Sequence, residues 1–72
     1  MDRLHFRIPG GTTLRVESFG GQWIVGRYCD DMPIAIAYEP DLEEAILAVS
    51  PFRVGDPWVY SILNEVYEKE AA

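Results

Sequence analysis

Two glycine pairs, Gly10-Gly11 and Gly20-Gly21, divide the first third of the chain into short segments. The segments on either side are rich in β-branched and aromatic residues, and glycine pairs in that setting are typical of hairpin turns. The pairs therefore predict an antiparallel β-meander. Its strands are expected at residues 4–8, 12–19, 22–28 and 32–38. Pro33 in the last of these segments suits an edge strand or a strand start. The sheet is expected to have four strands, or three if the last segment stays outside it.

After Tyr38 the apolar residues change to helical spacing. A capping-box pattern of Asp41 and Glu44 indicates the start of the first helix, and an alternative start has Pro40 as the first helical residue with Glu39 before it. The apolar face of this helix consists of Leu42, Ala45, Ile46 and Val49. Asp56 as N-cap and Pro57 at the first helical position begin a second helix, which extends to about Glu70. Its apolar face consists of Val59, Ile62, Leu63 and Val66. The chain is therefore expected to form a single small α+β domain over residues 1–72, with both helices packed on one face of the sheet.

The alternation along the first three strands predicts which side chains face the helices. Even-numbered residues are expected to point inward: Leu4, Phe6, Ile8, Leu14, Val16, Ile24 and Tyr28. Odd-numbered residues are expected to point outward: His5, Arg7, Thr13, Arg15, Glu17, Trp23, Val25 and Arg27. A register slip of one residue would instead place Trp23 in the core.

The charges are sorted along the sequence. Residues 1–29 hold four arginines and two carboxylates, whereas residues 30–72 hold ten carboxylates, one arginine and one lysine. The net charge of the whole chain is −6. Crowded carboxylates repel one another, so a surface that keeps them favours either solubility or a cationic partner. Glu65, Glu68 and Glu70 also oppose the dipole of the second helix near its C-terminus, which invites a binding explanation.

The residues expected to bind this partner come from the helical layer. They are Glu39, Asp41, Glu43, Glu44, Trp58, Tyr60, Glu65, Tyr67, Glu68 and Glu70. The carboxylates would capture lysines and arginines, and the aromatic side chains would anchor the contact. The partner is expected to be a basic protein, such as a nucleic-acid-binding protein or complex, rather than nucleic acid itself.

Enzymatic chemistry has no support in the residue spacing. His5 and Cys29 are the only side chains of their kinds, and Asp30-Asp31 lacks the spaced ligands of a calcium loop, so no catalytic residue, metal site or cofactor is predicted. The N-terminus has no apolar signal core, and the apolar runs are too short to cross a bilayer. These features favour a cytoplasmic protein without a membrane partner, in the host-cell cytoplasm if a phage encodes it.

Two resemblances bear on function. The stretch from Tyr38 to Ala45 resembles the entry to the first helix in HicB-type antitoxins, although this chain continues into a second acidic helix where a DNA-binding tail would be needed. In size, acidity and lack of catalytic residues the chain is similar to small acidic phage inhibitors, including many anti-CRISPR proteins and DNA mimics. The second resemblance implies a non-enzymatic inhibitor that blocks a basic, nucleic-acid-binding surface. The first implies an antitoxin, and it stays as an alternative.

Two further functions remain open. The cationic and aromatic residues expected on the outer sheet face, namely Arg7, Arg15, Trp23 and Arg27, would suit a module that binds nucleic acid or another anion. A homo-oligomer would form if the positive sheet of one copy met the negative helices of the next in a head-to-tail contact.

Overall fold

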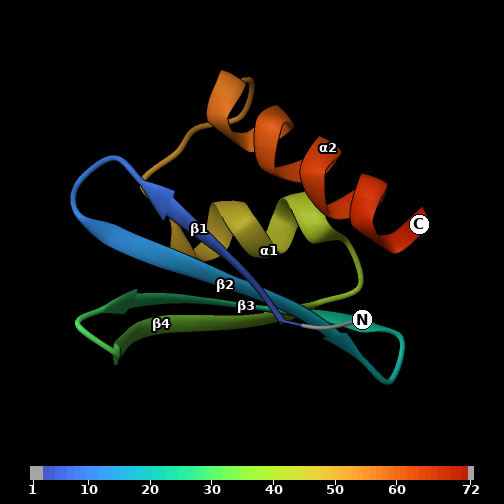
Figure 1. Cartoon of the computed structure of the whole chain (residues 1–72), viewed down its shortest axis with the longest axis horizontal. Coiled ribbons are helices and arrows are strands. Elements are labelled where there is room, and N and C mark those ends of the chain that lie inside the picture. Colours follow the sequence, from blue (N-terminus) through green and yellow to red (C-terminus); the bar gives the residue numbers. More distant parts are fainter. Residues whose placement is uncertain (1–2, 72) are drawn as a thin grey trace.

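Four antiparallel strands are followed by two helices that cover one face of the sheet (Figure 1). The computed structural model describes residues 3–71. The elements are β1 (Leu4–Ile8), β2 (Thr12–Phe19), β3 (Gln22–Cys29), β4 (Met32–Glu39), α1 (Leu42–Val49) and α2 (Pro57–Ala71). Each strand pairs with the next one along the chain, in the order β1-β2-β3-β4. The predicted α+β fold with a four-stranded meander is confirmed.

The lengths of the first two turns decide which side chains face the helices. Residues 9–11 form a three-residue turn that pairs Ile8 with Thr12, so even-numbered residues of β1 and β2 share a face. The next turn has only two residues, Gly20 and Gly21, and both take positive φ, 61° and 79°, as tight hairpins require. A two-residue turn pairs residues three apart in sequence, so even-numbered residues of β2 lie opposite odd-numbered residues of β3.

The expectation for the third strand was therefore wrong by one residue. Val16 pairs with Val25, and Ser18 pairs with Trp23. The side chains of β3 that share the helix-covered face are those of Trp23, Val25 and Arg27, whereas Ile24 and Tyr28 lie on the outer face. The alternation predicted for β1 and β2 is confirmed, because Leu14 and Val16 are fully buried.

The core lies between the inner face of the sheet and the two helices. Its fully buried side chains are Leu14, Val16, Val25, Leu42, Ala45, Ile46, Val59 and Val66. Burying an aliphatic side chain of this size contributes roughly 1.5–3 kcal/mol. Helix α1 packs on β3 and β4, where Ala35 and Ala37 leave room for it, and α2 packs on α1.

Both helices begin where the capping patterns predict. The Asp41 carboxylate accepts a hydrogen bond from the backbone N–H of Glu44 at 3.2 Å, which caps α1. The Asp56 carboxylate accepts one from the backbone N–H of Trp58 at 2.9 Å, at the start of α2. Each bond satisfies an N–H group that has no partner within its helix.

Within residues 3–71 no element covers the outer face of the sheet, and Tyr28 organises the part of this face next to the β3–β4 turn. The Tyr28 ring lies over Gly26, where a Cβ atom would come within 2.5 Å of the ring carbon Cε1. The Arg15 guanidinium stacks on the same ring, 3.9 Å from its centroid, and pairs with the carboxylate of Asp31 in the β3–β4 turn. Gly26 is therefore needed for the position of both side chains.

We expect Gly26→Ala to destabilise the protein by about 1–3 kcal/mol, because the new methyl group overlaps the Tyr28 ring and displaces it. Urea unfolding followed by circular dichroism measures the change.

The control is the same substitution in a Tyr28→Ala background. Gly26 is not among the glycines with positive φ, so alanine there meets no backbone strain once the ring is removed. The cost of Gly26→Ala should then largely disappear. An equal cost in both backgrounds would show that the Tyr28 ring is not the cause.

Candidate functional site

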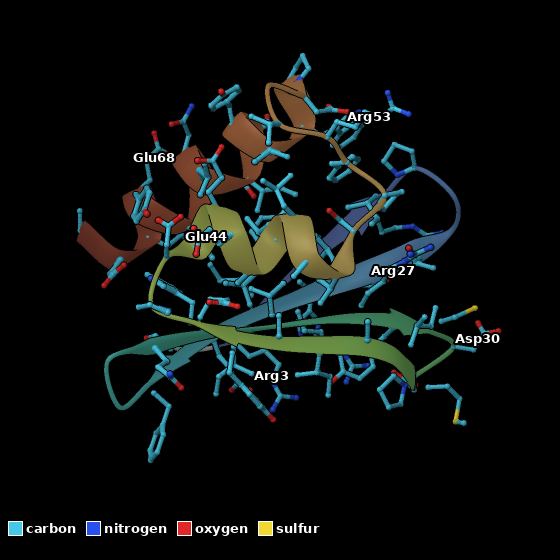
Figure 2. All side chains as sticks on the ribbon, turned by 180° about the vertical axis from the view of Figure 1, so that it is seen from behind. Arg3, Arg27, Asp30, Glu44, Arg53 and Glu68 are labelled. Carbon is cyan, nitrogen blue, oxygen red and sulfur yellow. The ribbon has the colours of Figure 1, made fainter. Side chains whose placement is uncertain are left out.

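Most of the carboxylates predicted to bind a partner gather at one end of the molecule. Helix α2 returns over α1, so the start of α1 and the end of α2 lie at the same end (Figure 1). Figure 2 shows Glu44 and Glu68 there, whereas Arg27, Asp30 and Arg53 lie at the opposite end. We call this surface the acidic end. It consists of Glu39 at the end of β4, Asp41, Glu43 and Glu44 at the start of α1, and Glu68 and Glu70 in the last turns of α2.

The acidic end has no cationic partner within residues 3–71. Residues 3–71 contain two ion pairs. One joins Arg3 to Glu17, with 3.6 Å between Nε and Oε2, and the other joins Arg15 to Asp31. Neither pair includes a residue of the acidic end. The arginines of the N-terminal half therefore do not neutralise these carboxylates.

The two helices place their charges in opposite electrostatic settings. Asp41, Glu43 and Glu44 lie at the N-terminus of α1, where the helix dipole favours anions by roughly 0.3–1 kcal/mol each. Glu68 and Glu70 lie at the C-terminus of α2, where the dipole disfavours them. Lys69 is the one basic residue of that last turn. The α2 carboxylates are therefore the part of the acidic end that helix stability does not explain.

The other predicted partner-binding residues divide between this end and other places. Tyr67 lies beside the acidic end. Its ring packs edge-on against that of Trp23, with 6.3 Å between the ring centroids, and Trp23 pairs across the strands with Glu39. Trp58 and Tyr60 lie at the start of α2, far from the acidic end, and the Trp58 ring stacks on Phe52. The acidic end therefore includes fewer residues than the set predicted to bind a partner.

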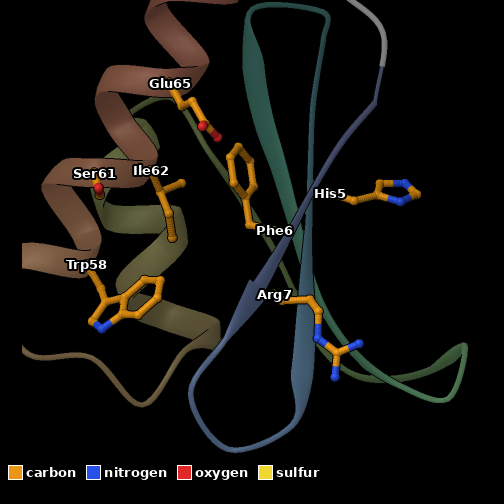
Figure 3. Close-up of a pocket in the computed structure, with 7 residues that line it drawn as sticks. All are labelled: His5, Phe6, Arg7, Trp58, Ser61, Ile62 and Glu65. Carbon is orange, nitrogen blue, oxygen red and sulfur yellow. The ribbon is translucent and has the colours of Figure 1, made fainter.

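Glu65 faces a different feature, a shallow groove between β1 and α2 (Figure 3). The groove has a volume of about 260 Å³ and is lined by Phe6, Trp58, Ile62 and Glu65 among others. His5 and Arg7 extend from β1 away from α2. Its volume is below that of most small-molecule sites. No sequence pattern predicts this groove, because its two walls, β1 and α2, come from opposite ends of the chain.

The cationic surface considered as an alternative does not form on one face. Arg7 and Arg15 belong to the outer face, whereas the register places Trp23 and Arg27 on the face toward the helices. The Arg27 Nε donates a hydrogen bond to the Thr12 hydroxyl at 3.2 Å, and Trp23 packs against the core. Arg15 is already held by Tyr28 and Asp31.

Residues suited to chemistry stay dispersed in the described part of the chain. His5 and Cys29 are both exposed. No group of three or more histidine, cysteine or carboxylate side chains suited to a metal ion occurs in residues 3–71. Neither helix is long and apolar enough to span a membrane.

Comparisons with protein-family models, with curated proteins and with solved structures find no match. The likeness of residues 38–45 to HicB-type antitoxins therefore remains a likeness of that segment alone.

We expect Glu68→Lys to stabilise the protein by about 0.3–1 kcal/mol, because a cation replaces an unpaired carboxylate near the C-terminus of α2. Thermal unfolding at low ionic strength measures the effect, which should shrink as salt is added.

Glu43→Lys is the matched control, because it makes the same change of charge at the same end of the molecule. It lies in the first turn of α1, where the dipole favours an anion, so we expect a smaller gain or a loss of stability. Equal stabilisation by both variants would mean that net charge alone, and not helix position, determines the effect.

Proposed function

We propose that the protein is a non-enzymatic interaction protein whose acidic end binds a basic surface of a partner protein. The observation that carries this proposal is the convergence of six carboxylates from β4, α1 and α2 at one end, without a cationic partner in residues 3–71. Charge held in this way is available to lysine and arginine side chains of another molecule. Such complementarity speeds association and selects the partner.

The acidic end also offers an anchor beside its charges. The Tyr67 ring is about half exposed, and its contact with Trp23 supports it from below. Partly exposed tyrosines are common at the centres of protein interfaces because they bury a large area and lose little side-chain entropy. The proposed contact is therefore a set of ion pairs around Tyr67.

We further propose that the partner is a nucleic-acid-binding protein and that the contact inhibits it. Lysines and arginines that bind phosphates are recognised by carboxylates in the same way, so an acidic end docked on them competes with nucleic acid. This is the mode of action implied by the similarity to small acidic phage inhibitors. The structure gives less support to direct binding of nucleic acid, because Trp23 and Arg27 face away from Arg7 and Arg15.

A fluorescent arginine-rich peptide serves as the probe for the acidic end. We expect it to bind the wild-type protein at low salt, and Glu44→Gln with Glu68→Gln to weaken binding by roughly tenfold, since two charge contacts are lost. The slope of log affinity against log salt concentration should also become shallower. Fluorescence anisotropy measures both quantities.

Asp30→Asn with Asp31→Asn is the matched control, because it removes two carboxylates from the opposite end of the molecule. Its affinity for the peptide should stay close to that of the wild type. If the two double variants bind equally weakly, only net charge attracts the peptide, and the acidic end is not a site.

The inhibitory step needs a second measurement on basic proteins captured from the native host. Wild-type protein should displace labelled DNA from the captured partner, whereas the Glu44→Gln, Glu68→Gln variant should not. A partner that keeps its DNA in the presence of saturating wild-type protein would exclude inhibition by competition.

A further inference from the structure

Strand β4 is an edge of the sheet whose outer side has no partner in the described part of the chain. It lies at the end of the strand order, pairs with β3 and packs under α1. None of the backbone hydrogen bonds formed outside the regular elements involves a residue of β4. Unpaired N–H and C=O groups along such an edge are a template for another strand.

The two edges of the sheet are protected very differently. The edge strand β1 has only five residues and carries the charged side chain of Arg7, and a short strand with a charge of this kind discourages edge-to-edge pairing. Strand β4 is longer and has no charged residue before Glu39. Its one irregularity is a register shift at its start, opposite Arg27 and Tyr28, and the pairing is regular from Ala35 onward. The protein therefore leaves one edge open and blocks the other.

Exposed apolar side chains are concentrated on this open edge. Met32, Ile34, Ile36 and Tyr38 are 69%, 53%, 46% and 56% exposed, and they make up four of the nine large apolar side chains exposed in residues 3–71. Ile24, which is half-buried, lies beside Tyr38 on the same outer face. Contiguous apolar surface of this kind marks an interaction site.

We propose that β4 pairs antiparallel with β4 of a second copy of this chain, about a two-fold axis at Ile36. An axis of this kind stands perpendicular to the sheet, so it pairs a residue with its own counterpart in the second copy. The outer faces of the two sheets then lie on the same side, and so do the helix-covered faces. The two sheets become one sheet of eight strands, with all four helices on one face.

The sequence of β4 is complementary to itself in this register. Ile36 lies opposite Ile36 of the second copy, Ile34 lies opposite Tyr38, and the small inner residue Ala35 lies opposite Ala37. Large side chains thus meet large ones on the outer face, and small ones meet small ones beneath the α1 helices. Aliphatic and aromatic pairs directly across two strands are favourable, and no charged pair falls within residues 34–38. This palindromic match is the reason to choose a second copy over an unrelated peptide.

Two features limit the strength of the contact. Pro33 cannot donate a hydrogen bond, so the pairing is confined to residues 34–38. Beyond that stretch Asp31 of one copy approaches Asp41 of the other, and these like charges repel. A short strand pair buries less area than a standard interface, so we expect a reversible dimer with a dissociation constant on the order of micromolar or weaker. Salt should strengthen it by screening the aspartates, whereas salt weakens binding at the acidic end.

Sedimentation velocity of the full chain over a wide concentration range tests the assembly. We expect a monomer–dimer equilibrium that Ile36→Lys weakens at least tenfold, because the two-fold axis brings both new lysines together. Val54→Lys is the matched control, since Val54 is 80% exposed and lies in the α1–α2 connection. A monomer at every concentration, a series of species larger than a dimer, or equal effects of the two variants would overturn the proposal.

Cross-linking tests the register and does not depend on whether Ile36→Lys folds. In a Cys29→Ser background, Ile36→Cys places two thiols opposite each other across the axis, with Cα atoms about 4.5–5.5 Å apart, within the range for a disulfide. Ile34→Cys in the same background is the control, because its two copies would lie about 14 Å apart along the strands. Mild oxidation should cross-link the Ile36→Cys variant at least tenfold faster than the Ile34→Cys variant. Equal rates, or faster cross-linking of the Ile34→Cys variant, would contradict pairing about Ile36.

Discussion

The helices are stable only because the sheet presents one apolar face to them, and the length of each turn decides which side chains form that face. The three-residue turn after β1 keeps the even-numbered residues of β1 and β2 together, and the two-residue turn at Gly20-Gly21 continues that face with the odd-numbered residues of β3. Leu14, Val16 and Val25 therefore meet in one buried layer. One extra residue in the second turn would expose Val25 and turn Tyr28 toward the helices. The core and the stack of Arg15 on Tyr28 both depend on this parity.

The local elements could be predicted from the sequence, whereas the faces of β3 could not be predicted from hydrophobicity. Both helix starts follow from an aspartate and the backbone N–H groups next to it, and such contacts span only two or three residues. Along β3 the two alternating sets, Trp23 with Val25 and Ile24 with Tyr28, are both apolar. Alternation alone therefore does not distinguish them. The information lay in the two-residue turn, which fixes the pairing of every residue beyond it.

The candidate site shows the same division between local and long-range information. The carboxylates around the start of α1 are neighbours in sequence, so their proximity was predictable. Their meeting with Glu68 and Glu70 depends on the direction in which α2 returns over α1, and no local pattern in the sequence encodes that direction. Trp58 and Tyr67 were expected to act together, but nine residues of helix separate their Cα atoms by about 14 Å along the axis. A single small contact therefore does not include both.

The order of elements along the chain has a consequence for biosynthesis. All the strand pairs join neighbours in sequence, so the sheet forms from local contacts that are fast to make. It is complete at Glu39, but its inner face stays uncovered until α1 and α2 have been synthesised. During that interval Leu14, Val16 and Val25 face water, and a partly made chain is open to association with other nascent chains. The two helices thus end this exposure once they are synthesised, because they bury the apolar face of the sheet.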